Sequence, residues 1–532
     1  MFTKYLRHIA PAAALLLSLG LGSCVGDLDV TSIDPKSKGE PDASGLFNKC
    51  YANMALAGNG GANGDCDIAG LDGGTSGFVR QLYNAEVLTT DEAICCWGDE
   101  GISAFNYNEW DASHPMLKGL YARLYFGISV CNHYLEVESG ADATMTAEVR
   151  FLRAYYYSVL MDLWGNVPFA TTVSTENPRQ ISRADLFTWI EGELLACKDD
   201  MSEPQARTSA SEGYGRADRS AAWMLLARLY LNAETYTGTP RWQDAADYAK
   251  LVIESPHKLF TAGNGTYSAY QMLFMGNNGE NGSSVEALLP LLQDGKTTTS
   301  WGTTLFLIAG TYKAAQETPG RGTTETWAGN RARRDLVDKF FPNGNAPADA
   351  DVAQMTAAAG DDRALLYSKE RNLTVDNVGE FTDGYTVAKF TNVYSDGGTP
   401  HSSQFVDTDY FLMRSAEAYL TYAEATARLN GGQTTTEGTG YVNDLRERAH
   451  ASTQSQYSLR QLCDEWSREF YHECLRRTVL VRYGYFGGAN GYNWEWKGGL
   501  QAGRNFDSHL NLFALPEDDI NANSNLTQNP GY

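Results

Sequence analysis

The stretch that decides the fold is AEVRFLRAYYYSVLMDLWGNVP, residues 147–168. Its large apolar side chains recur at spacings of three and four residues, which places them in one stripe on a helix. They are Leu152, Tyr155, Val159 and Leu163. Gly165 and Pro168 follow, and both residue types end helices. The sequence therefore predicts a helix that begins near Ala147 and buries one face.

The same helical spacing recurs further along the chain and predicts more helices at 222–231, 242–253, 416–427 and 462–474. Alanines lie at several of the stripe positions, and small side chains allow two helices to approach closely. Paired helices that alternate alanine with bulky aromatics resemble tetratricopeptide units, although no strict repeat of about 34 residues runs through the chain.

Long irregular stretches rich in Gly, Asn and Thr separate these helices at 58–77 and 263–326. Loops held by a helical scaffold often carry binding residues. No linker rich in Pro or Ser divides the chain after its first residues. We expect one large domain over residues 46–532, since packed helical repeats extend without a new core.

The N-terminus has the three-part layout of a secretory signal. Two basic residues precede a short apolar run, and Leu21-Gly22-Ser23 comes directly before Cys24. The apolar run is shorter than the roughly 20 residues of a membrane-spanning helix. We predict a signal peptide at 1–23, a lipid on Cys24 and a tether at 24–45. An ordinary cleaved signal with a chance cysteine is the alternative.

The chain is strongly acidic, with 65 Asp and Glu against 42 Lys and Arg and a net charge of −23. Such a surface repels nucleic acid and anionic lipid, so neither is an expected partner, whereas a neutral ligand is not repelled. Of the nine cysteines, the eight after Cys24 form no C-x-x-C pair, which gives no support to a zinc or redox motif. Disulfide pairing cannot be assigned from the sequence.

The sequence contains no complete catalytic constellation, and we expect no enzyme. Adjacent acids at 91–92, 361–362 and 518–519 could cleave a glycosidic bond in principle. In an acidic protein, however, neighbouring acids are usually solvated surface residues or helix caps. A surface glycosidase remains the enzymatic alternative.

The sequence leaves calcium binding open. Hard oxygen ligands occur in the Gly-rich loops, namely Asp65, Asp67, Asn277, Asn278 and Glu280. The regular spacing of a calcium loop with a distal glutamate is missing. Ordinary turn residues explain the same pattern, so no metal ligand is assigned.

Aromatic side chains in the irregular stretches indicate sugar binding. A pyranose ring presents an apolar face that stacks on aromatic rings, while polar side chains bond its hydroxyls. Candidates are Trp97 in Cys96-Trp97-Gly98-Asp99, Trp301 and Phe306 in a Thr- and Gly-rich segment, and Trp327. Burial in the core is the alternative for each ring taken singly.

Several segments together resemble the RagB/SusD family of Bacteroidetes surface lipoproteins. They are AEVRFLRAYY at 147–156, GRADR at 215–219, AAGDDRA at 358–364 and DINANSNLTQNPGY at 519–532. The resemblance runs from the lipidation motif to Tyr532 and implies an all-α fold of tetratricopeptide-like helix pairs with long ordered loops. It also implies no catalysis, a lipid anchor on the outer-membrane surface and a SusC-like, TonB-dependent transporter as partner.

Within the family, the chain is similar to its starch-binding founder, for example in WEWKGG at 494–499. This similarity implies a glycan site with Arg80 as donor to a hydroxyl or ring oxygen and with Trp97, Phe306 and Trp327 as stacking rings. Phe306 stands where the founder has a tyrosine, and Cys95 replaces a further tryptophan. An oligosaccharide, with α-glucan favoured, is the implied ligand. Another glycan, such as a fructan, xylan or host glycan, or a peptide is the alternative, because relatives keep the scaffold and change these loops.

Overall fold

The helix predicted from residue 147 is α6, Ala143–Trp164, in the computed structural model. The Asp142 carboxylate caps its first turn by accepting the N–H of Met145 at 2.9 Å. The chain leaves the helix at Gly165, whose φ of 74° suits glycine. The structure confirms both the helix and its end.

The structure describes residues 42–138, 140, 142–315, 317 and 320–532. The predicted signal peptide, the lipidation site Cys24 and nearly all of the tether lie outside the described residues. Residues Leu46–Tyr532 group into one compact unit. No described helix has the length and hydropathy needed to cross a membrane.

Helices make up most of the regular structure. The α-helices are α2 Ala43–Ala55, α3 Phe78–Tyr83, α4 Ile102–Tyr107, α5 Pro115–Val137, α6 Ala143–Trp164, α7 Arg183–Cys197, α8 Arg219–Leu231, α9 Ala233–Thr237, α10 Trp242–Glu254, α11 Ala269–Met272, α12 Thr304–Ala309, α13 Arg334–Phe340, α14 Val352–Ala359, α15 Ala416–Leu429, α16 Thr436–Arg448, α17 Leu459–Phe470, α18 Arg476–Arg482 and α19 Glu517–Ala522. A π-helical turn, η3 Asn84–Leu88, continues α3. Short 3-10 turns are η2 Gly61–Asn63, η4 Ser283–Glu286, η5 Lys497–Gly499 and η6 Ser508–Asn511.

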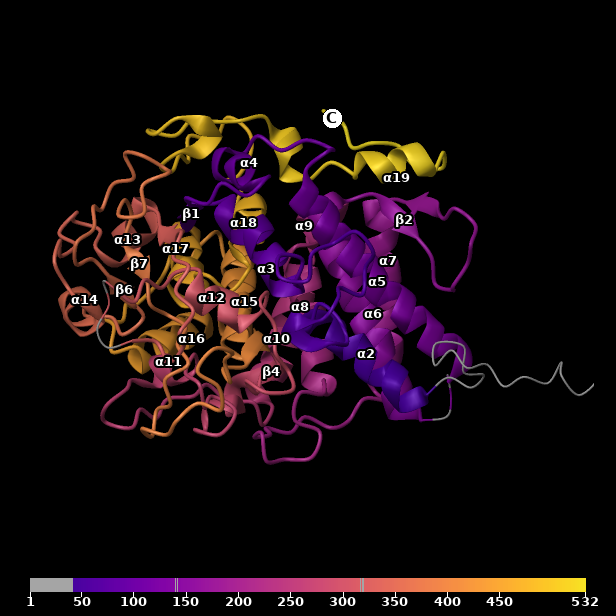
Figure 1. Ribbon diagram of the computed structural model, residues 1–532, viewed down its shortest axis with the longest axis horizontal. Helices are drawn as coiled ribbons and strands as arrows, with labels where there is room; N and C mark the ends of the chain where they lie inside the picture. Colours follow the sequence, from indigo (N-terminus) through magenta and orange to yellow (C-terminus); the bar gives the residue numbers. More distant parts are fainter. Residues whose placement is uncertain (1–41, 139, 141, 316, 318–319) are drawn as a thin grey trace, which may run out of the picture. The chain divides into compact units, whose positions relative to one another are not determined.

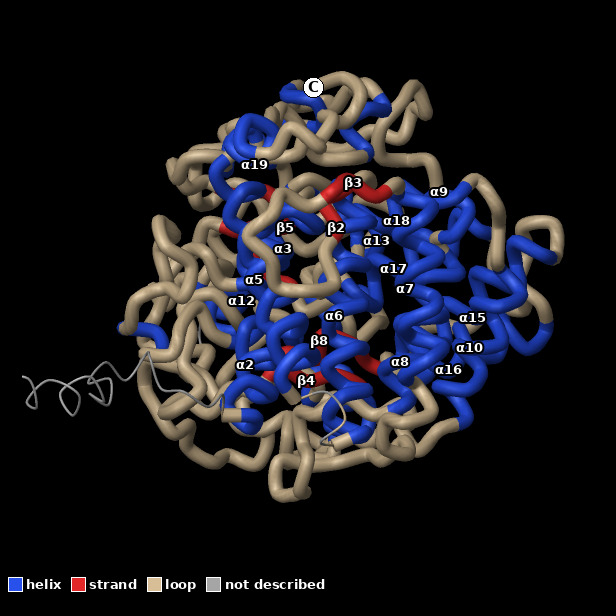
Figure 2. The backbone as a smooth tube through the Cα atoms, turned by 90° about the vertical axis from the view of Figure 1, so that its right-hand side faces the viewer, coloured by secondary structure: helices blue, strands red, loops and turns tan. Residues whose placement is uncertain are grey.

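The long helices pack as neighbouring pairs. Helix α6 lies between α5 and α7, as Figure 2 shows. Helix α10 contacts α8 and α15, and α15 contacts α16, and these four lie together in Figure 2. The predicted all-α fold of helix pairs is confirmed, and α8, α10 and α15 match the predicted segments. The stripe at 462–474 is only partly right, because α17 ends at Phe470 and the chain turns through left-handed backbone at His472 and Cys474.

The strands are short and form four two-stranded antiparallel sheets within the described residues. They are β1 Ala93–Cys95 with β5 Asn330–Ala332, β2 Val167–Phe169 with β3 Arg179–Ile181, β4 Ala287–Leu291 with β8 Tyr410–Arg414, and β6 Leu366–Tyr367 with β7 Thr386–Val387. Strand β4 and helices α11 and α12 lie inside the stretch 263–326, so the expectation of a wholly irregular segment is wrong. Pro290 fits β4 because every strand of a two-stranded sheet is an edge.

A cluster of buried charged side chains lies where β8 meets α17. We call it the ion cluster, and its members are Glu286, Asp361, Arg363, Lys389, Arg414, Arg448, Glu465, Glu469 and Glu473. Arg414 bonds Glu286 and Glu469 at 2.7 Å each and Glu473 at 2.8 Å. Buried charges are tolerated only when paired in this way.

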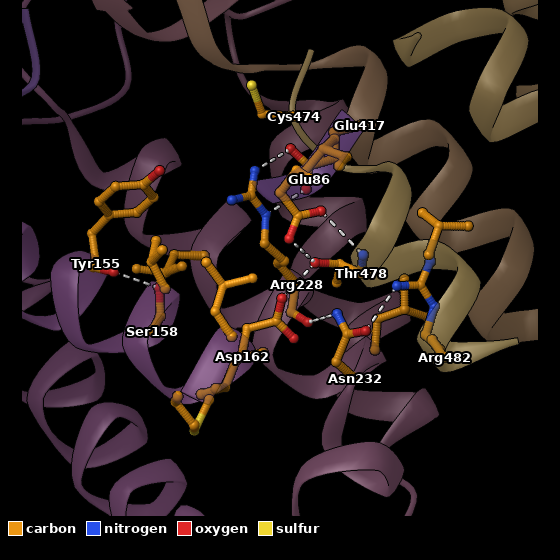
Figure 3. Close-up of a pocket in the computed structure, with 18 of the residues that line it drawn as sticks. Glu86, Tyr155, Ser158, Asp162, Arg228, Asn232, Glu417, Cys474, Thr478 and Arg482 are labelled. Atoms are coloured by element: carbon orange, nitrogen blue, oxygen red, sulfur yellow. Dashed lines mark hydrogen bonds and ion pairs between the residues drawn. The ribbon is translucent and has the colours of Figure 1, made fainter. Parts of the chain in front are cut away.

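A small cavity of about 70 Å³ lies among α6, α8, α15 and α18. Figure 3 shows Thr478 between two carboxylates in this cavity. Its hydroxyl donates to Asp162 at 2.5 Å and lies 3.2 Å from Glu86, while its N–H donates to Glu86 at 3.1 Å. Burial and the neighbouring Asp162 raise the pKa of Glu86 to about 8.

We expect this raised pKa to make the protein less stable as the pH rises from about 5 to 8. A glutamate in the unfolded chain has a pKa near 4.3, so between about pH 5 and 8 only the folded state keeps Glu86 protonated. The proton therefore stabilises the folded state at the lower pH, and this stabilisation is lost as the pH rises to the folded pKa. Glu86→Gln cannot ionise, and it should flatten the fall by about 1–3 kcal/mol. Urea unfolding over this pH range measures the effect. Glu176→Gln changes an exposed carboxylate and should leave the dependence of the unfolding free energy on pH as in the wild type. If Glu86→Gln also keeps the wild-type dependence, the pKa of Glu86 is not raised.

Candidate functional site

A hollow of about 400 Å³ gathers three tryptophans and one arginine from separate parts of the chain. Its lining residues are Gly74, Thr75, Arg80, Trp97, Asp99, Trp301 and Trp327. They come from α3 and the loop before it, from the turn after β1, and from the loops that precede α12 and β5. We call this hollow the tryptophan site. All three tryptophans are half-buried, so each is anchored and still accessible.

The β1–β5 pair positions Trp97. Cys95 pairs with Asn330, and the N–H of Cys96 donates to the Gly329 carbonyl at 3.1 Å. Gly329 has a φ of 101°, and a Cβ there would lie 2.2 Å from Trp97 Nε1. Only glycine both adopts this backbone and leaves room for the indole. The Trp97 ring is therefore seated directly on the backbone of Gly329, the residue before β5.

Trp327 is fixed through both its backbone and its ring. Its N–H donates to the Ala309 carbonyl at 2.9 Å. Its indole Nε1 donates to Glu325 at 2.7 Å, and the other Glu325 oxygen accepts from Gln404 at 2.9 Å. Because the indole N–H is already bonded, the face of the ring is what Trp327 offers to a ligand.

Trp301 forms the third wall of the tryptophan site. Its ring lies 6.0 Å from that of Trp327 at an interplanar angle of 43°, and 4.8 Å from the ring of Phe405. Two tilted rings make a bent surface rather than a flat one. The loop reaches this place because Gly302 packs against Gly77, where a Cβ on either residue would lie 2.8 Å from the other's Cα.

Arg80 lies beneath Trp97 on α3 with 8% of its surface exposed. Its guanidinium carbon is 5.5 Å from the Trp97 ring and 5.1 Å from the Phe306 ring, within cation–π range. Burial lowers the pKa of Arg80, while the carboxylate of Asp99 opposes that shift. Its one side-chain hydrogen bond within the described residues runs from Nη1 to the Gly74 carbonyl at 3.3 Å. Donor capacity thus remains for a ligand.

Phe306 does not line the tryptophan site, and its predicted role as a stacking ring is wrong. It lies on α12 with 0% of its surface exposed. Its ring packs against Tyr83 at 5.3 Å and Trp97 at 6.1 Å. The cause is that Thr304–Ala309 is a buried helix rather than a loop. Phe306 supports Arg80 and Trp97 from below.

The structure brings Arg80, Trp97 and Trp327 together at one hollow, as the sequence predicted. Trp301, a candidate aromatic that the family resemblance did not assign to the glycan site, completes it together with Asp99, which the sequence did not indicate. Trp301 stands out in the sequence as a loop aromatic, which is the signal that could have selected it. Asp99 is exposed, two residues after Trp97, and its carboxylate can accept hydrogen bonds from sugar hydroxyls. Cys95 is buried in β1 and contributes no surface.

The adjacent acids do not form a hydrolytic pair at the tryptophan site. Asp99 is the only carboxyl group among the described residues that line it, whereas glycosidases use two. Asp91 is buried and bonds Arg476 at 2.7 Å and Lys339 at 2.9 Å. Asp361 belongs to the ion cluster. These acids hold the fold together.

Four of the five residues considered for calcium, Asp67, Asn277, Asn278 and Glu280, use side-chain oxygens within the protein. The Asn277 side chain accepts the Ser395 N–H at 2.9 Å, and that of Asn278 accepts the Asp409 N–H at 3.0 Å. Asp67 pairs with Lys49. Within the part of the chain that the structure describes, no three His, Cys, Asp or Glu side chains gather in a way that could hold a metal.

Comparison with known proteins places these observations in a family context. Residues 259–532 match the model of the SusD family, and residues 81–231 match a model described as starch-binding and associating with the outer membrane. The chain is 39% identical to the starch-binding protein SusD of Bacteroides thetaiotaomicron, with 100% of both chains covered.

Solved structures share the fold at lower identity. A SusD-like protein from Bacteroides fragilis superposes with a TM-score of 0.68 at 19% identity, covering 92% of this chain and 96% of that one. Surface glycan-binding protein A from Bacteroides thetaiotaomicron, in complex with laminarihexaose, gives a TM-score of 0.63 at 19% identity and covers 92% of this chain and 98% of that one. At this identity the likeness shows the fold alone.

Proposed function

Because the chain belongs to the SusD family, we propose that it binds glycans at the bacterial outer-membrane surface through the tryptophan site. The observation that carries the proposal is the convergence of Trp97, Trp301 and Trp327 on one hollow beside Arg80. Three accessible ring faces can stack on the apolar faces of sugar rings, and Arg80 and Asp99 can bond hydroxyls.

The favoured ligand is an α-glucan. The tilt of 43° between Trp301 and Trp327 suits a chain that bends from one sugar ring to the next, as α-linked glucans do. The 39% identity to a starch-binding protein over the whole chain supports the same ligand. Another glycan or a peptide stays the alternative, because the lining residues sit on loops that can change without altering the helices.

The proposed role is delivery rather than catalysis. A lipid on Cys24 would hold the protein at the outer-membrane surface, and a SusC-like, TonB-dependent transporter would accept the bound oligosaccharide. The matched family model, described as associating with the outer membrane, supports this location. One carboxyl group at the tryptophan site supports binding without cleavage.

Calorimetric titration of the purified chain with maltoheptaose, laminarihexaose and a fructan oligosaccharide tests the ligand class. We expect maltoheptaose to bind best, with a dissociation constant of about 0.1 mM, or roughly 5.5 kcal/mol. Tighter binding of another glycan would overturn the α-glucan assignment, and no binding of any glycan would overturn the function. New reducing ends after prolonged incubation would instead support the glycosidase.

A further inference from the structure

A second hollow, of about 420 Å³, lies among α11, α14 and the residues beside β6 and β7. It shares none of its described lining residues with the tryptophan site. Its lining includes Tyr267, Gln271, Met275, Val352, Leu365 and Ala388. Gln271 lies on α11 and Val352 on α14, and the others lie directly beside α11, β6 and β7, which gather on one side of Figure 1. We propose that this second hollow is an accessory binding site for a short neutral saccharide.

The floor of the second hollow is apolar, and the ring of Tyr267 stands at its rim. Met275 and Leu365 are each 1% exposed and form the floor, and Val352 and Ala388 are half-buried at its sides. Tyr267 is half-buried as well. An apolar floor beside an accessible aromatic ring suits a ligand with one C–H face, which is the character of a pyranose.

The charges around the second hollow cancel. Lys389 donates to Glu473 at 2.6 Å and to the Tyr471 carbonyl at 2.8 Å. Arg321 makes a two-pronged bond to Glu317 at 2.7 and 3.0 Å. Asp351 is the remaining charged residue of the described lining, and it pairs with Lys369 at 3.3 Å. The two acids and two bases of the lining therefore carry no net charge that would select an ion. The expected ligand is therefore neutral.

The rim offers hydrogen-bonding groups that the fold does not use. Gln271 caps its own helix, since its Oε1 accepts the Ser268 N–H at 2.9 Å, and this leaves its Nε2 without a partner within the described residues. The Tyr267 hydroxyl likewise has no hydrogen-bond partner among them. An N–H₂ donor and a phenol beside an apolar floor match the alternating hydroxyl and C–H surfaces of a sugar.

The second hollow adds to the proposed function a site that can be removed separately from the tryptophan site. Its size is close to the 400 Å³ of the tryptophan site and within the usual range of ligand pockets. An oligosaccharide that reaches both sites of one chain would stay bound for a longer time than at either site alone, because its second contact is then intramolecular.

Equilibrium dialysis of the full chain in detergent with labelled maltotriose tests the second hollow. All variants are made in the double variant Trp97→Ala/Trp327→Ala, which removes binding at the tryptophan site. Ala353→Trp places a large ring in the second hollow from an exposed position on α14, and Ala357→Trp makes the same change at an exposed position of that helix outside the hollow. Tyr267→Ala removes the ring at the rim.

In the double-variant background we expect one residual maltotriose site per chain. Ala353→Trp should weaken it at least about tenfold, Tyr267→Ala should weaken it as well, and Ala357→Trp should not. No residual site, or one that neither Ala353→Trp nor Tyr267→Ala changes, would overturn the inference. Failure of the proposed function gives a different result, namely a single site that the tryptophan variants leave intact and Ala353→Trp removes.

Discussion

Replacing Arg414 with methionine should lower the free energy of unfolding by about 3–5 kcal/mol. Arg414 is 1% exposed and holds three carboxylates of the ion cluster, Glu286, Glu469 and Glu473. Its guanidinium also lies 4.0 Å from the Phe470 ring. Methionine fills much of the same volume but leaves these acids facing one another without a common cation. The cost is that of uncompensated buried charge.

Urea denaturation at neutral pH, followed by circular dichroism, measures this loss. Arg334→Met is the matched control, since Arg334 pairs with Asp338 at 3.2 Å on an exposed face of α13. Exposed pairs contribute about 0–1 kcal/mol, so the control should unfold almost as the wild type does. A loss in Arg414→Met as small as that of the control would show that the ion cluster does not hold β8 against α17.

The ion cluster should also make the fold sensitive to acid. Burial alone would raise the pKa of Glu469, but Arg448, Arg414 and Arg363 outweigh it and hold that pKa well below its usual range. A depressed carboxylate pKa contributes stability that is fully present above the unfolded value, near 4.3, and is lost as the pH falls toward the folded value. Arg414→Met should therefore weaken this acid-dependent part of the stability.

The helical scaffold could be predicted from local pattern. The apolar side chains at helical spacing in α8, α10 and α15 are visible in the sequence itself. Only α10 buries a single stripe, whereas α8 and α15 bury most of their residues. The end of α17 could not be predicted, since the left-handed backbone at His472 and Cys474 is imposed by tertiary contacts. Glu92, 380 residues away in sequence, accepts the His472 N–H at 3.1 Å. A window of neighbouring residues does not contain that information.

The tryptophan site could be predicted in part. Trp97 and Trp327 follow from being aromatics in polar, Gly-rich surroundings, and the structure brings them to one hollow. Phe306 has similar surroundings in the sequence and is nevertheless buried, because Thr304–Ala309 forms a helix under the hollow. Trp301, five residues before it, is the ring that reaches the surface. Which of two nearby aromatics faces the ligand depends on the packing of Gly302 on Gly77.

Removing the tryptophan rings should have the largest effect on ligand binding. Trp97→Ala and Trp327→Ala should each cost about 1–3 kcal/mol of binding free energy for maltoheptaose, the contribution of one stacked and desolvated ring. Together they should leave no heat that calorimetry can measure at the tryptophan site. Trp301→Ala should weaken binding to a similar extent, because it removes one face of the bent pair with Trp327.

Two further variants separate lost binding from damaged folding. Trp242→Ala makes the same chemical change at a half-buried tryptophan of α10, beside Arg428 and outside the hollow, and should bind maltoheptaose as the wild type does. Phe306→Leu keeps an apolar side chain beneath Arg80 and should weaken binding less than any of the three tryptophan variants. If Trp97→Ala and Trp327→Ala both bind like Trp242→Ala, the ligand does not stack on these rings.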